Sequence, residues 1–320
     1  MPVLTYIESS NGKIKKNGFE LASYSHELAK LLNTDAVAIT INALDNTELS
    51  NYGISKVLKV NNDSLSEFNA KQYADVISQA MNSLDANTVI LSSSLDSKYL
   101  APILSAQNNS AYINNVTSLP SSLSPFTVKR TVFTNKAYSD TSTSSSKIII
   151  GLSNNSYGIQ ENKTSLTEED FLVSVADSSL SVESSEKVSG KISIADADIV
   201  VSAGRGMKGP ENWNLIEDLA NTLGAATACS KPVSDMGWRP HSEHVGQTGK
   251  PVATNLYIAI GISGAIQHLA GINSSKIKVV INNDPEAPFF KAADYGIVGD
   301  AFDVVPRLNE KLKEFKAQNS

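Results

Sequence analysis

The sequence has few of the residues that form disulfides or bind metal ions. It has one cysteine, Cys229, and four histidines among 320 residues. A single cysteine excludes an intramolecular disulfide and is typical of a reducing compartment, so we expect a cytoplasmic protein. The histidines and the cysteine lack the spacing of a zinc site, so no metal is expected either.

Positive charge and long apolar runs are missing as well. The 27 basic residues are outnumbered by 33 acidic ones, and the net charge of -6 argues against binding to nucleic acid or to an anionic membrane. The longest apolar stretch, around residues 256–266, is too short to cross a bilayer. The first residues, MPVLTYIESSNGKIKK, have no apolar segment after a basic start, so we expect no signal peptide.

What is present is an ordinary globular composition, with 41% hydrophobic residues and a length that suggests two domains. In the first half, apolar runs alternate with helical periods. We expect strands at 3–9, 35–43 and 86–94, helices at 19–32, 74–84 and 97–108, and late strands at 128–140 and 146–153. Because strands that alternate with helices form βαβ units, residues 1–185 are predicted to be an N-terminal α/β domain with a parallel sheet.

The second half predicts a domain of the same class. The serine-rich stretch at 174–190 is typical of a linker. After it, ADIVVSAGRGMKG predicts a buried strand and a glycine turn, followed by a helix at 211–223. Further strands are expected to end at Asn282 and to lie within 293–305. We therefore expect residues 186–320 to form a C-terminal α/β domain, also with a parallel sheet.

The stretch YIAIGISGAIQHLAGI, residues 257–272, places polar side chains in an apolar run. Its glycines predict a buried strand that turns sharply into a helix. Backbone N–H groups at such a helix start are free to bind phosphate, next to Ser263, Gln267 and His268. Arg205 follows the glycine turn of an earlier strand and Asn282 ends a later one, so three strand ends offer polar groups to one edge.

Other interpretations of these motifs stay open at this point. Taken singly, a glycine turn, a strand-end Asn282 or a lone His268 in an apolar helix is more often structural. The segment SAGRGMKG is not GxGxxG with a trailing acid, EHVGQTGK lacks the spacing of a P-loop, and GISGA is not the GxSxG of hydrolases. The residues alone therefore favour a nucleotide or phosphate site without naming its ligand.

Three segments together resemble a known family: SAGRGMKGPENW, GQTGKPVATNLYIAIGISGAIQHLAGI and INNDPEAPFFKAADYGIVGD. They are similar to the signature of the electron transfer flavoprotein alpha subunit. The resemblance implies FAD on the C-terminal domain and a heterodimer with a beta subunit, contacted by the N-terminal domain. It also implies an electron carrier rather than an enzyme, one that accepts electrons from acyl-CoA dehydrogenases and passes them one at a time to a membrane quinone oxidoreductase.

Carried over onto this chain, the resemblance implies two sets of FAD contacts. In the first set, the Thr248 hydroxyl would lie near flavin N5 and His268 at the C2 carbonyl. The whole of this flavin set would be Arg205, Ser230, Gln247, Thr248 and His268. The pyrophosphate and adenosine would be met by Ser263, Gly264, Gln267, Asn282 and Asp300.

One position departs from the family. The family has Ser-Arg directly after the strand that follows the helix expected at 211–223. At that place the chain has Ser230 and Lys231. Lysine keeps the positive charge but cannot stack a planar guanidinium on the flavin.

Two alternatives to the carrier stay open. One is a nucleotide-binding α/β enzyme related to the FAD/NAD modules of thiamine-dependent enzymes, which would need a positioned acid or base. The other is a nucleotide-sensing module, which would bind ADP without flavin.

Overall fold

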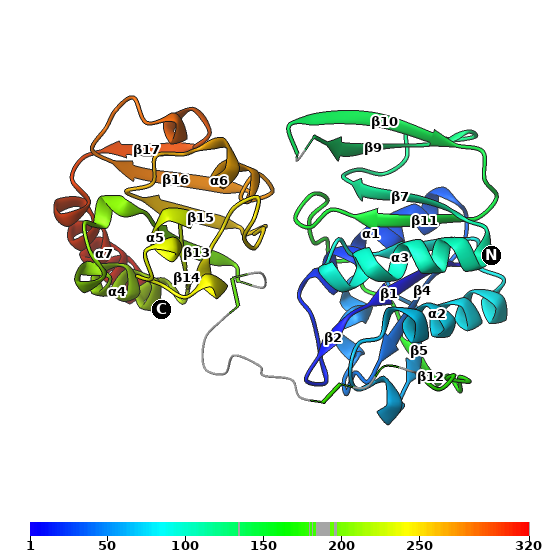
Figure 1. The fold of residues 1–320 in the computed structure, drawn as a ribbon. Helices are drawn as coiled ribbons and strands as arrows, with labels where there is room; N and C mark the ends of the chain where they lie inside the picture. The colour runs from blue at the N-terminus through cyan, green and yellow to red at the C-terminus, as the bar shows by residue number, and fades with distance from the viewer. Residues whose placement is uncertain (134, 179, 181, 184–192, 195–196, 320) are drawn as a thin grey trace. The chain divides into compact units, whose positions relative to one another are not determined.

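The structure is a computed structural model that describes residues 1–133, 135–178, 180, 182–183, 193–194 and 197–319. The chain divides into two compact units, Met1–Glu186 and Lys187–Ser320. Each unit contains its own sheet with helices packed against it (Figure 1). The expected α/β class, with a parallel sheet in each half of the chain, is confirmed.

The N-terminal unit is built on a ten-stranded sheet in the order β10-β9-β7-β11-β6-β1-β4-β5-β12, with β8 paired to β9. Every pairing from β7 through β12 in this order is parallel, whereas β8, β9 and β10 pair antiparallel. A small hairpin of β2 (Ser9–Ser10) and β3 (Lys13–Ile14) follows the first strand. The sheet strands are β1 (Val3–Ile7), β4 (Ala36–Ile41), β5 (Lys56–Val60), β6 (Thr88–Leu91), β7 (Ala111–Val116), β8 (Ser122–Leu123), β9 (Phe126–Val132), β10 (Ala137–Thr143), β11 (Ile148–Leu152) and β12 (Thr167–Asp170).

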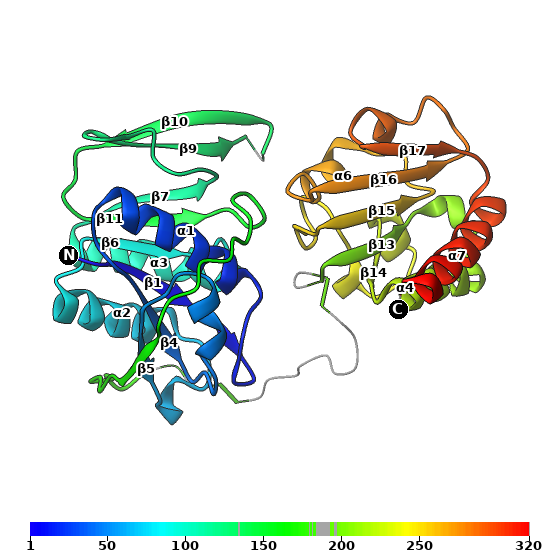
Figure 2. The ribbon, with the colours of Figure 1, turned by 180° about the vertical axis from the view of Figure 1, so that it is seen from behind.

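Helices cover both faces of this sheet, which is why its central strands are mostly apolar and almost wholly buried (Figure 1 and Figure 2). Helices α2 (Ala70–Leu84) and α3 (Leu95–Asn108) pack on one face, and α1 (Asn17–Leu31) packs on the other. The 3-10 turn η1 (Thr47–Asn51) lies between β4 and β5, and η2 (Asp63–Leu65) lies between β5 and α2. The helices expected in this half are confirmed, and the late strands prove to be β9, β10 and the central β11.

The serine-rich stretch does not begin as a free linker. The Gln79 side chain donates to the Ser174 carbonyl at 2.8 Å and accepts from the Ser174 N–H at 2.9 Å, and Gln72 Nε2 donates to the Ala176 carbonyl at 2.9 Å. Both glutamines lie on α2, so residues 174–176 are docked on that helix. The expectation of a linker is therefore wrong for its first residues, and most of the rest of 174–190 lies outside the described residues.

The C-terminal unit has a five-stranded, fully parallel sheet in the order β14-β13-β15-β16-β17. Helices α4 (Asn214–Leu223) and α7 (Ala301–Gln318) pack on one face, and the segments around α6 (Ile266–Ala270) cover the other. The remaining helical elements are α5 (Lys231–Asp235), η3 (Arg205–Met207), η4 (Pro210–Asn212), η5 (His241–Glu243) and η6 (Pro288–Lys291). The strands are β13 (Ile199–Ala203), β14 (Ala226–Cys229), β15 (Leu256–Ile260), β16 (Ile277–Asn282) and β17 (Tyr295–Val298).

One expected strand of this unit is shorter than the segment predicted for it, which ends as helix. The segment 293–305 forms β17 over its first part, but α7 begins at Ala301. The Asp300 carboxylate accepts the Phe302 N–H at 2.9 Å and so caps the helix, which then buries Val305 at i+4 from Ala301. The aspartate after the strand is the start signal of a helix, and the apolar residues beyond it have a helical rather than a strand period.

Candidate functional site

The carboxyl edge of the C-terminal sheet collects polar residues from every strand. Because the five strands run parallel, their carboxyl ends meet at one edge, where open α/β sheets bind ligands. Each strand ends at or just before one of the residues expected to touch the cofactor, in the sheet order Ser230, Arg205, Ser263, Asn282 and Asp300. The sheet topology thus brings together positions that lie up to 95 residues apart in sequence, from Arg205 to Asp300.

Two turns of this edge are in backbone contact. The Gly206 N–H donates to the Gly261 carbonyl at 3.1 Å, and a Cβ on Gly204 would lie only 2.3 Å from that same oxygen. Only glycine permits this approach, which places the turn after β13 against the turn after β15. Arg205 stands between these glycines with an exposed side chain, and within the described chain its guanidinium forms no ion pair or hydrogen bond.

The turn after β15 has the predicted strand-turn-helix form. Gly264 has φ +88°, and a Cβ there would lie 2.4 Å from the Phe289 backbone nitrogen. The Phe289 N–H donates to the Ser263 carbonyl at 3.1 Å, so η6 holds the turn in place. The helix that follows, α6, is only five residues long. Ser263 and Gln267 are exposed at the edge, as a ligand contact requires.

The Gly246–Thr248 loop lies against both neighbouring strand ends. The Gln247 N–H donates to the Gln267 carbonyl at 2.7 Å, and the Val245 N–H donates to the Cys229 carbonyl at 3.0 Å. The loop therefore bridges α6 and the end of β14. Gln247 and Thr248 are exposed beside the turn after β15, so the structure groups these two expected contacts with Ser263 and Gln267.

His268 lies beneath this surface rather than on it. Its side chain is 6% exposed, and its Nε2 is 2.9 Å from the hydroxyl of the buried Tyr257. Burial lowers the pKa of His268 to about 4, and the nearby His244 acts in the same direction. The imidazole is therefore neutral at physiological pH.

Ser230 and Lys231 begin α5 at the end of β14. The Ser230 N–H donates to the Ala203 carbonyl at 3.1 Å, which fixes this turn beside the end of β13. Lys231 is exposed and forms an ion pair with Asp235 at 2.9 Å, one helical turn later. An exposed pair of this kind is weak, so the ammonium can reorient toward an anionic ligand at little cost.

Asn282 and Asp300 each have structural partners. Asn282 Nδ2 donates to the Ile262 carbonyl at 3.1 Å and its Oδ1 accepts the Asp284 N–H at 3.0 Å. Asp300 caps α7 and lies 3.6 Å from Lys208 Nζ. Both side chains thus hold the edge together, and their contacts with an adenosine stay a prediction.

Sequence reasoning missed Lys208 at this edge and Tyr257 in the core beneath it. Lys208 lies 4.5 Å above the Phe302 ring and pairs with Asp300, so it adds a second cation near Arg205. Its position three residues after Arg205 in a turn was the available signal. Tyr257 was hidden in an apolar run, where a buried tyrosine cannot be told from any other core residue.

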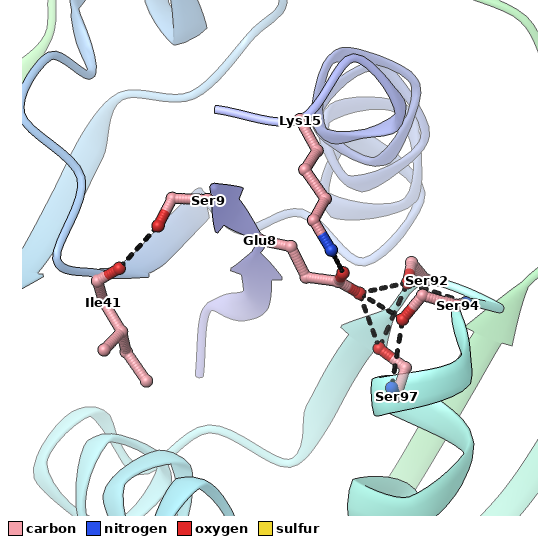
Figure 3. A network of polar contacts seen from close by, with 7 residues as sticks. All are labelled: Glu8, Ser9, Lys15, Ile41, Ser92, Ser94 and Ser97. Atoms are coloured by element: carbon pink, nitrogen blue, oxygen red, sulfur yellow. Dashed lines mark hydrogen bonds and ion pairs between the residues drawn. The ribbon is translucent and has the colours of Figure 1, made fainter. Parts of the chain in front are cut away.

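A second polar cluster lies at the carboxyl edge of the N-terminal sheet (Figure 3). Glu8, which follows β1, is 3% exposed; its carboxylate accepts hydrogen bonds from the hydroxyls of Ser92, Ser94 and Ser97, and Lys15 Nζ lies 2.8 Å away. Burial by itself raises the pKa of Glu8, but Lys15 and the serines lower it by more. The chain's own carboxylate therefore occupies the start of α3, where a ligand anion would bind.

Comparison with known proteins agrees with this arrangement. Residues 3–171 match the model of the electron transfer flavoprotein domain, and residues 193–273 match that of the electron transfer flavoprotein FAD-binding domain. The second match runs from before β13 to beyond α6, so it includes Arg205, the Gly246–Thr248 loop and the turn after β15. No helix among the described residues is long and apolar enough to cross a membrane.

Individual relatives extend the match over nearly the whole chain. The electron transfer flavoprotein subunit alpha of Bacillus subtilis (strain 168) is 36% identical over 270 residues, 83% of either chain. That of Syntrophomonas wolfei is 32% identical over 312 residues, 97% of this chain and 98% of the relative. That of Paracoccus denitrificans is 56% identical over 119 residues, 37% of this chain and 39% of the relative. The chain therefore belongs to the electron transfer flavoprotein alpha subunit family and binds FAD.

Proposed function

We propose that the carboxyl edge of the C-terminal sheet holds the FAD and that the chain carries electrons as the alpha subunit of a heterodimer with a beta subunit. The main observation behind the proposal is that backbone hydrogen bonds join the separate loops of this edge to one another. Gly206 bonds to Gly261 and Gln247 bonds to Gln267, so exposed groups from three separate segments form one continuous surface. A cofactor as long as FAD needs such a surface.

The residues of this edge fit the chemistry of FAD. Arg205, without an ion pair in the described chain, is suited to a phosphate, and the exposed turn with Ser263 and Gln267 supplies polar groups beside it. Gln247 and Thr248 would lie along the isoalloxazine ring. When bound, the FAD supplies the site that takes up and releases electrons, and the chain holds and orients it.

For the electron route we propose acyl-CoA and related dehydrogenases as donors and a membrane quinone oxidoreductase as acceptor. The support for this route is the family resemblance of the second half of the chain. In this proposal the protein is a carrier that transforms no substrate of its own, and it works in the cytoplasm, as its single, buried cysteine favours.

The direct test is to co-express the chain with its candidate beta subunit and to record the visible spectrum during stepwise reduction. We expect a yellow heterodimer with one FAD, reduced in two separable one-electron steps. A colourless heterodimer that binds ADP tightly would instead support the nucleotide-sensing module. A flavoprotein that turns over a substrate without any partner would support the nucleotide-binding enzyme.

The same preparation tests the role of Lys231. Replacing Lys231→Arg restores the planar guanidinium that the family has here, so we expect unchanged FAD content and a first one-electron potential raised by about 30–60 mV. Spectroelectrochemical titration measures this shift. Lys313→Arg, an exposed position on α7, is the matched control and should leave the potential unchanged. An equal potential in Lys231→Arg and wild type would show that this side chain does not reach the flavin.

A further inference from the structure

The contact between Tyr257 and His268 links the core of the C-terminal unit to its edge. Tyr257 lies on β15 and is fully buried, and His268 lies on α6 directly after the exposed Gln267. The tyrosine hydroxyl is 2.9 Å from Nε2 of the imidazole. The Phe289 ring is also a neighbour, with its centroid 6.1 Å from that of the imidazole. The imidazole therefore has little freedom to rotate.

The direction of this hydrogen bond follows from the neighbours of the phenol. Tyr257 is fully buried, and Nε2 of His268 is the one hydrogen-bond partner that the described residues give its hydroxyl. A phenol that accepted a hydrogen bond from Nε2 would leave its own buried proton without an acceptor, so the phenol donates to Nε2. Nε2 is then the acceptor nitrogen of the ring.

A neutral imidazole carries one proton, so the proton must lie on Nδ1. Nδ1 is buried and forms no well-formed hydrogen bond to the described residues. The Val245 backbone raises the pKa of His268, as a carbonyl near an N–H does, but does not complete the bond. A buried donor left in this state is costly, which points to an acceptor supplied by a bound ligand.

We propose that Tyr257 is a positioning residue that fixes His268 as the Nδ1–H tautomer, so that the imidazole offers an N–H rather than a lone pair to an acceptor of the FAD. This inference rests on the proposed function, since it requires the FAD at this edge. Tyr257 itself would not touch the cofactor. Its effect would pass entirely through the orientation and protonation of one histidine.

The test uses the low histidine content of the chain, which has four histidines. The alpha chain is labelled with 15N-histidine and combined with an unlabelled beta subunit, and His268→Asn assigns the His268 signals. We expect a protonated nitrogen at Nδ1 and an unprotonated one at Nε2, unchanged between pH 6 and 8. In Tyr257→Phe this single pattern should be lost, and FAD affinity should fall about two- to tenfold.

Tyr24→Phe is the matched control, because it removes the same atom from a buried tyrosine of the N-terminal unit, whose hydroxyl donates to the Ser118 carbonyl at 3.2 Å. It should alter neither the His268 signals nor FAD affinity. A protonated Nε2 in the wild type, or an identical His268 pattern in Tyr257→Phe and wild type, would overturn the inference. A wild type with the expected tautomer but without FAD would contradict the proposed function alone.

Discussion

At the scale of single residues, the buried carboxylate of Glu8 should contribute strongly to stability. Glu8→Gln keeps the shape of the side chain but removes the negative charge that Lys15 contacts, and it gives the serine hydroxyls of Figure 3 a weaker acceptor. We expect a loss of about 2–4 kcal/mol in the free energy of unfolding at pH 7. Urea unfolding of the two proteins measures it.

The pH dependence of this difference has a definite sign. The folded-state pKa of Glu8 lies below its unfolded value of about 4.3, so the unfolded state binds the proton first as pH falls. The advantage of the wild type over Glu8→Gln should be complete above that value and should disappear as pH falls through the lower, folded-state pKa. Glu27→Gln, which breaks an exposed pair with Lys30, is the control and should cost at most about 0.5 kcal/mol. An equal loss in both variants would contradict this account.

Where a chemical signal was local, the sequence predicted the place of a residue in the fold. Arg205, Ser263 and Gln267 follow glycine turns, and the structure places all three exposed at one edge. Glu8 gave no such signal, because its partner Ser97 lies 89 residues away in sequence and a glutamate after a strand is ordinarily a surface residue. The structural roles of Asn282 were equally out of reach, since its acceptor is a backbone carbonyl 20 residues earlier.

At the scale of elements, the turn after β15 depends on Gly264. Gly264→Ala adds a Cβ 2.4 Å from the Phe289 nitrogen at a φ of +88°. We expect a loss of about 2–4 kcal/mol, from backbone strain and from the clash together, and a loss of FAD binding. Thermal or urea unfolding, with FAD content determined in parallel, measures both effects.

Gly224→Ala separates the two contributions to that loss. Gly224 ends α4 with φ +67°, and a Cβ there meets nothing within 4 Å. This variant carries the strain without the clash, so we expect a loss of only about 1 kcal/mol and normal FAD content. If Gly264→Ala were no worse than Gly224→Ala, the contact between the turn and η6 would have no part in forming the site.

Strands could be predicted from sequence where burial on both faces requires a run of apolar residues. Strands β1, β4 and β15 are apolar runs because helices or loops cover both faces of their sheets. Strand β12, with the sequence TEED, is exposed throughout and pairs with β5 at the sheet edge. Ion pairs such as Lys56 with Glu169 accompany this pairing, so nothing in the local sequence of β12 indicates a strand. The docking of residues 174–176 on α2 is likewise decided by distant glutamines.

At the scale of the whole molecule, FAD should stabilise the two units unequally. A ligand stabilises the structure that binds it by about 2.7 kcal/mol at a hundredfold excess over its dissociation constant. Because the proposed contacts all lie in the unit Lys187–Ser320, hydrogen exchange of the heterodimer with and without FAD should slow there. The slowing should be greatest at residues 203–206, 245–248 and 261–268, the segments proposed to hold the cofactor.

The sheet of the N-terminal unit provides the internal control for that experiment. Its carboxyl edge already holds the Glu8 carboxylate at the start of α3, so FAD should leave exchange at residues 92–97 unchanged. Because both units are measured in one sample, a general change in conditions would slow exchange in both. If FAD protected residues 92–97 as strongly as residues 261–268, the ligand would also bind at the carboxyl edge of the N-terminal sheet, and the assignment of the site to one sheet edge would be wrong.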